Sequence, residues 1–189
     1  MKLVATLKGK PAAAIALPLI LFFLSAPACL AAHGEDGRTQ IAVFDFELED
    51  SSAGAGIAGD QAADATSMSA ANAEVRRVIE QSGRYRLVDV SAANAAAVRD
   101  HDLRGCNGCE AQVASALGAE QSLFGVIRRI SRTEYVIGFQ LRDAKSGALI
   151  AARDTGLRMG ANYSWSRGAS RLIEDRLLGT AAKRLNSGD

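Results

Sequence analysis

Blocks of apolar and polar residues follow one another along this chain, and their periodicity changes from block to block. Runs rich in Val, Ile and Phe predict buried strands, whereas apolar residues at three- and four-residue steps predict amphipathic helices. Gly83 and Gly118 stand where two of the helical patterns stop, a common position for glycine. We predict strands at 39–48, 85–90, 122–130, 135–142 and 148–158, and helices at 61–81, 91–100, 109–118 and 165–185.

The resulting order, β-α-β-α-α-β-β-β-α, indicates an α/β fold. Helices separate the early strands, and the turn DAKSG joins the last two strands as a hairpin. We therefore expect one domain over 39–185, with a mixed sheet of about five strands packed against helices. Residues 186–189 form a polar tail that we expect to fray.

The first 32 residues have the layout of a secretory signal. Three lysines precede a long apolar stretch that ends in small residues, and the polar sequence HGEDGR follows. Two prolines interrupt the apolar stretch, which favours a cleaved signal over a stable spanning helix. We expect cleavage near Ala31 or Ala32 and a periplasmic protein; an uncleaved anchor and a lipid-modified Cys29 are the alternatives.

Cleavage changes the charge and the cysteine count. The whole chain has 22 Lys and Arg residues and 21 Asp and Glu residues, and the signal removes three lysines. The remaining chain has no basic surplus, so charge gives no support for a nucleic-acid partner. Cys106 and Cys109 remain, and export places them in an oxidising compartment.

The segment GAGIAG, residues 54–59, has the glycine spacing of a dinucleotide-binding loop, but its surroundings differ. In that loop the first glycine directly follows a strand, and an acidic residue comes about 20 residues further on. Here five residues separate the apolar run from Gly54, and two of them, Glu49 and Asp50, would repel phosphate. The acidic residue that ends the second predicted strand, Asp89, lies 30 residues after the motif. We expect no NAD, no FAD and no other cofactor.

The segment CNGC limits what its two cysteines can do. Attachment of haem needs C-x-x-C-H, and Glu110 occupies the position of the histidine. A zinc site needs three or four protein ligands, and His101 is the one histidine near enough in sequence to join Cys106 and Cys109.

We expect Cys106 and Cys109 to form a structural disulfide at the start of the helix 109–118. Asn107 and Gly108 are residue types that tolerate the tight backbone of so short a ring. A thiol–disulfide redox site is the alternative, because a helix start lowers the pKa of a thiol.

Acidic residues end the first predicted strand. Asp45, Glu47 and Glu49 alternate, so they share one face of a regular strand, and Asp50 follows directly. Together they could bind a metal ion or a small ligand at the carboxyl end of the sheet. A solvated strand end is the simpler interpretation.

Two aromatic residues precede or begin the last helix. Tyr163 and Trp165 could anchor a partner protein. Trp165 also heads the apolar stripe of the helix, and we expect it to be buried against the sheet.

Several segments resemble known envelope proteins. IAVFDFE, LGAEQSLFGVI, EYVIGFQLRDAKSG and ALIAARDTGLR look like the amino-terminal domain of TolB and its relatives. CNGCEAQVASALGA and SWSRG are similar to an uncharacterised family of secreted proteobacterial proteins, known as a domain of unknown function. The resemblance covers roughly residues 41–178. It implies a fold and a compartment, and no reaction.

Three functions are compatible with these observations. The first is a periplasmic, non-enzymatic accessory or interaction protein that binds an envelope protein through sheet-edge and loop surfaces. The second is a thiol–disulfide protein that works through Cys106 and Cys109. The third is a ligand- or metal-binding protein that uses the acidic end of the first strand.

The signal predicts where the mature protein begins. Amino-terminal sequencing of protein recovered from the periplasm should start near His33. Recovery of chains that retain Met1 in the membrane fraction would contradict cleavage.

Overall fold

The computed structural model describes residues 37–53, 61–93, 103–158 and 164–179, all within the unit Ala32–Asp189. The predicted signal, GAGIAG, His101, Tyr163 and the residues 180–189 lie outside these ranges. The elements in chain order are β1 (Thr39–Val43), β2 (Glu47–Asp50), α1 (Gln61–Gln81), β3 (Tyr85–Val88), the 3₁₀ turn η1 (Val90–Ala92), α3 (Cys109–Ala116), β4 (Gln121–Arg129), β5 (Glu134–Asp143), β6 (Leu149–Arg158), α4 (Trp165–Leu172) and the π-helical turn η2 (Ile173–Leu177).

The strands form one mixed sheet in the order β3-β1-β4-β5-β6, and β2 also pairs with β4. β1 runs parallel to both β3 and β4, whereas β4, β5 and β6 form an antiparallel meander. The predicted α/β class and mixed sheet are therefore confirmed. The prediction of about five strands differs by one, because the first predicted strand is divided into β1 and β2.

A β-bulge divides this strand. Val43 lies opposite Leu123 of β4, whereas Glu47 lies opposite Val126, so three residues of one strand face two of the other. The N–H of Phe46 turns away from the ladder and donates to Oδ1 of Asn72 in α1, at 2.9 Å. The extra residue reverses the alternation of the side chains that follow.

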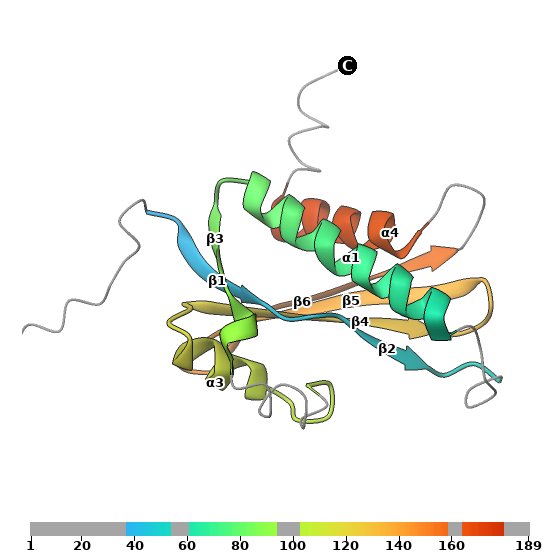
Figure 1. Cartoon of the computed structure of the whole chain (residues 1–189), viewed down its shortest axis with the longest axis horizontal. Coiled ribbons are helices and arrows are strands. Elements are labelled where there is room, and N and C mark those ends of the chain that lie inside the picture. Colours follow the sequence, from blue (N-terminus) through green and yellow to red (C-terminus); the bar gives the residue numbers. More distant parts are fainter. Residues whose placement is uncertain (1–36, 54–60, 94–102, 159–163, 180–189) are drawn as a thin grey trace, which may run out of the picture. The chain divides into compact units, whose positions relative to one another are not determined.

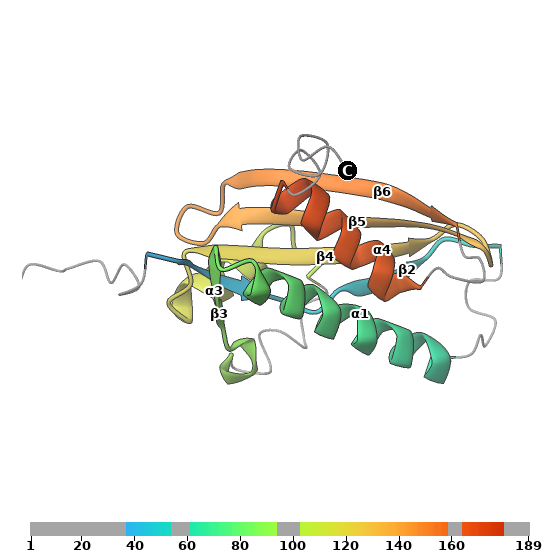
Figure 2. The same cartoon turned by 90° about the horizontal axis from the view of Figure 1, so that it is seen from above.

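Helices cover both faces of the sheet (Figure 1). On one face α1 and α4 lie side by side (Figure 2) and pack on a core cluster that includes Ile41, Val43 and Phe46. On the other face α3 packs on a smaller cluster around Phe44 and Phe124. Residues 43 and 44 thus point to opposite faces, as expected for a strand, whereas 43 and 46 share a face because of the bulge.

Most helices follow the sequence pattern. α1 spans the predicted residues, and α3 begins at the predicted residue and ends at Ala116. α4 begins at Trp165, where Oγ of Ser164 accepts the N–H of Arg167, and it continues as η2. Of the helix predicted at 91–100, the described residues show the turn η1 alone, and residues 94–100 lie outside the described ranges.

Trp165 is buried, as the sequence predicts. Its side chain is 3% exposed, and its ring meets the ring of Tyr135 edge to face at a centroid distance of 5.5 Å. Arg129 lies over both rings, and its hydrogen bond to Asp64 raises the pKa of its guanidinium. Within the described ranges, no helix is both long enough and apolar enough to cross a membrane.

The bulge requires glycine on the neighbouring strand. A Cβ atom at Gly125 of β4 would overlap the ring of Phe46, whereas a Cβ at Gly156 of β6 would meet nothing within 4 Å. We expect Gly125→Ala to lower the free energy of unfolding by about 1–3 kcal/mol through overpacking. Urea unfolding would measure the loss. Gly156→Ala is the matched control, and equal stability of the two variants would contradict the packing argument.

Candidate functional site

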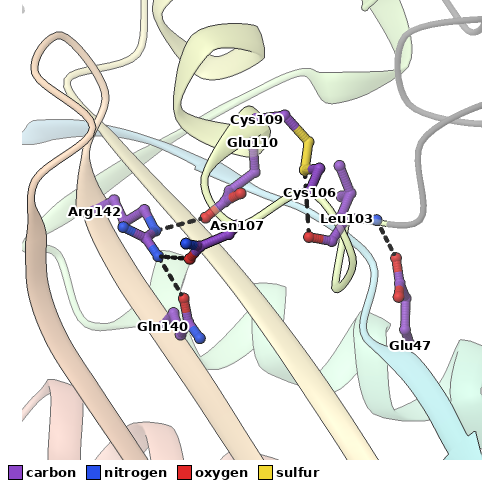
Figure 3. The surroundings of a disulfide bond; sticks show 8 residues. All are labelled: Glu47, Leu103, Cys106, Asn107, Cys109, Glu110, Gln140 and Arg142. Carbon is purple, nitrogen blue, oxygen red and sulfur yellow. Dashed lines mark hydrogen bonds and ion pairs between the residues drawn. A yellow bond between two sulfur atoms is a disulfide. The ribbon is translucent and has the colours of Figure 1, made fainter.

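The CNGC loop is a tight turn at the start of α3. The Cα atoms of Cys106 and Cys109 are 5.8 Å apart, and their sulfur atoms lie at disulfide distance (Figure 3). Asn107 has φ 46° and Gly108 has φ 117°, both in the left-handed region. Asparagine and glycine are the residues that adopt this conformation most readily, so the sequence NG suits the turn.

A buried carboxylate follows the second cysteine. Glu110 is 2% exposed, and its Oε1 lies 3.0 Å from Nε of Arg142 in β5, whose side chain is 12% exposed. The other carboxylate oxygen, Oε2, is buried and has no hydrogen-bond partner. From the sequence alone, Glu110 serves only to exclude haem attachment, and Arg142 is not among the predicted site residues.

Arg142 joins the loop to the sheet. Its Nη2 donates to Oδ1 of Asn107 at 3.1 Å and to Oε1 of Gln140 at 3.0 Å, and its Nη1 donates to the carbonyl of Gly147 at 3.1 Å. A Cβ at Gly108 would lie 3.7 Å from the guanidinium carbon. One guanidinium therefore holds the turn, the start of α3 and the β5–β6 connection together.

The bulge supplies a second attachment of the loop. Because the alternation is reversed after residue 46, Glu47 points to the face that carries α3. Its Oε1 accepts the N–H of Leu103 at 2.9 Å, and Nη1 of Arg104 donates to the carbonyl of Leu48 at 3.4 Å. The segment that leads into CNGC is thus fixed to β2.

The four acidic residues of the predicted ligand site have separate polar partners. Asp45 pairs with Arg76 at 2.7 Å, Glu49 pairs with Arg128 at 3.0 Å, and Asp50 pairs with Arg129 at 3.0 Å; Glu47 binds the loop as described above. Hydrogen bonds from Ser52 hold the pKa of Asp50 below its usual value. The structure therefore does not gather these side chains around one point.

A cavity of about 800 Å³ lies at the carboxyl ends of β1 and β3. Its wall includes Asp45, Arg76 and Asp89. Hydrogen bonds from the side chain and the backbone N–H of Ser91 lower the pKa of Asp89. This is the edge at which open α/β sheets usually bind ligands. A smaller cavity of about 140 Å³ lies beside the CNGC loop and is lined in part by Glu110.

The predicted partner anchor is only partly described. Tyr163 lies outside the described residues. Trp165 is part of the core, so its side chain offers little surface to a partner in this conformation.

The ion pair of Glu110 and Arg142 yields a stability prediction. Arg142→Met leaves a buried carboxylate without its cation, and we expect the free energy of unfolding to fall by about 3–5 kcal/mol. The double variant Glu110→Gln, Arg142→Met should recover much of this loss, because no buried charge then remains. Urea unfolding measures both.

Arg153→Met, at an exposed position of β6, is the matched control and should change stability by less than about 0.5 kcal/mol. If Arg142→Met were as stable as this control, the ion pair would not be a structural element.

Several solved structures are similar to this chain. The carboxy-terminal domain of LpoB from Salmonella enterica has 14% sequence identity and a TM-score of 0.46, over 64% of this chain and 83% of that domain. Lipoprotein GNA1162 from Neisseria meningitidis has 15% identity and a TM-score of 0.41, over 79% of this chain and 94% of that chain. TolB from Acinetobacter baumannii also has 15% identity and a TM-score of 0.41, over 75% of this chain and 29% of TolB.

Sequence comparison points to a family rather than to a characterised relative. No curated protein shows significant sequence similarity to the chain. The family model DUF3280, described as a protein of unknown function (DUF2380), matches residues 39–177. The chain belongs to this family, and the predicted membership of an uncharacterised family is thereby confirmed.

Proposed function

We propose that this protein is an exported, non-enzymatic interaction protein that binds a protein of the cell envelope through its edge strand β6. The signal-like start of the chain supports export to the periplasm. The exposed edge of β6 is the observation that carries the proposal. Neither a cofactor nor a nucleic acid has a role in it.

β6 is a long strand with one neighbour. Among the described residues it pairs with β5 alone, through nine of its ten residues; a register shift between Leu141 and Arg142 leaves Ile150 without a partner in β5. Leu157 is its one buried residue. Leu149 is 52% exposed and Ile150 is 50% exposed, the highest values among the large hydrophobic side chains of the described ranges. A free strand edge can accept an extended segment of another protein through main-chain hydrogen bonds.

The protection of this edge is uneven. Natural edge strands are usually short or carry charges or proline, which prevent pairing with other chains. In β6 the charged residues Arg153, Asp154 and Arg158 follow a first half, 149–152, with the uncharged sequence LIAA. We infer that this first half receives an extended, largely apolar segment of the partner.

A thiol–disulfide function is the second candidate. Cys106 and Cys109 are both partly exposed at the start of a helix, where a thiolate would be stabilised. Against this role, Glu47 and Arg142 fix the loop on two sides, which suits a clip that sets the start of α3. Loss of a reductase or isomerase activity in Cys106→Ser, with the fold retained, would favour the redox function.

The docking proposal is testable by cross-linking in living cells. A photo-reactive amino acid at position 150 should form an adduct with one envelope protein, and Leu149→Lys with Ile150→Lys should weaken partner binding by at least about tenfold. Both side chains are half exposed, so the fold should tolerate the charges.

Ile130 provides the matched control, because it is 42% exposed and lies outside β6. A photo-reactive amino acid at position 130 should not form the adduct. A lysine at position 130 should not weaken partner binding. Adducts of equal yield from both positions, or adducts with a second copy of this chain alone, would contradict docking of an envelope partner on β6.

A further inference from the structure

We propose that Cys106, Cys109 and Glu110 form a binding site for a thiophilic divalent cation of the Zn²⁺ class once the disulfide is reduced. The proposal concerns the face that carries α3 and is independent of partner docking on β6. It assigns a ligand to the buried carboxylate of Glu110, one oxygen of which has no hydrogen-bond partner in the fold.

The three side chains already lie together. Their ligand atoms, the two Sγ atoms and one carboxylate oxygen, are all within 4.8 Å of one another, the one such group found among the residues that the structure describes. Zinc binds thiolate at about 2.3 Å and carboxylate at about 2.0–2.2 Å in a tetrahedral arrangement. Ligand atoms around such an ion are separated by about 3.5–4 Å, so small shifts complete three of the four positions.

Glu110 shows that the site has unused binding capacity. Its Oε2 is buried and has no donor, although its Oε1 meets Arg142. A buried carboxylate oxygen without a partner is unfavourable, because it has lost its water and gained nothing in exchange. In Figure 3 the carboxylate of Glu110 lies between the guanidinium of Arg142 and the cysteine pair, so one oxygen remains for a cation on the cysteine side.

The charges favour a divalent ion. Two thiolates and one carboxylate carry three negative charges, and the guanidinium of Arg142 with a divalent cation carries three positive charges. The complex would therefore be neutral, which matters because Glu110 is buried and uncompensated buried charge is costly. Arg142 would also hold the carboxylate in place from the far side, as an outer partner of a metal ligand does.

The chemistry balances with a dithiol reductant. The reductant donates two electrons to the Cys106–Cys109 bond and is itself oxidised to a disulfide, while each released sulfur takes up one proton. Binding of the cation then displaces both thiol protons. The fourth position of the tetrahedron is left for a water molecule, and the oxidised protein has no thiolate to offer.

From the sequence alone, the candidate zinc ligands are Cys106, Cys109 and His101. The third ligand that the structure supplies is instead the residue directly after Cys109. An acidic residue in the first turn of a helix is common, so the pattern alone did not distinguish Glu110 from a solvated one.

Titration with Co²⁺ and then Zn²⁺ tests the site. The full mature chain would be reduced with a phosphine without oxygen, and near-ultraviolet circular dichroism would check that the reduced fold is intact. We expect one equivalent of Co²⁺ with a thiolate-to-cobalt charge-transfer band, which Zn²⁺ abolishes. The oxidised protein should show no band.

Two variants test whether Glu110 is a ligand in addition to the two cysteines. Glu110→Gln, in reduced protein, should weaken Zn²⁺ binding by more than about tenfold. Glu80→Gln, at an exposed position of α1, should bind like the unmodified protein. The proposal is overturned if reduced protein takes up no Co²⁺, if Glu110→Gln binds equally well, or if uptake occurs after reduction has unfolded the chain.

Discussion

The β-bulge at residues 44–46 determines how the two faces of the sheet are used. Without the extra residue, Phe46 and Leu48 would face α3 and leave the larger core, while Glu47 and Glu49 would point beneath α1 and α4. With it, the apolar residues on both sides of the bulge serve one core. Glu47 then lies on the face of α3, where it accepts the N–H of Leu103 and so holds the loop that leads to Cys106. The bulge requires glycine at position 125, because the ring of Phe46 lies where a Cβ would be, and the side-chain oxygen of Asn72, which accepts the N–H of Phe46.

The disulfide loop depends on the bulge at one end and on Arg142 at the other. Glu47 fixes the approach to the turn, and Arg142 fixes the turn itself through Asn107 and Glu110. These attachments come from β2 and β5, which lie on opposite sides of β4 in the sheet. The loop is consequently attached across the width of the central strand, a geometry that local sequence does not encode.

The sequence predicted features that depend on neighbouring residues. The helical period over 61–81 and the meander of the last three strands are local patterns, and both were found as predicted. The bulge was missed because IAVFDFEL is apolar enough to be one continuous strand; the residues that divide it, Asn72 and Gly125, are distant in sequence. For the same reason CNGC was recognised as a site, whereas its buried pair with Arg142 was not. Pairing of Glu110 with Arg142 depends on packing of α3 against β4 and β5.

The sheet topology has a consequence for the order of folding. β4, β5 and β6 are joined by short turns, so the meander closes small loops, whereas Ile41 of β1 pairs with Gln121, 80 positions further along the chain. Closing a long loop costs more entropy than closing a short one, and contacts between distant residues form slowly. We expect the meander to assemble early and β1, although it is synthesised first, to join last. Until then Leu123 and Ile127 of β4 lie on an unpaired strand edge, and in that interval the chain is most exposed to aggregation.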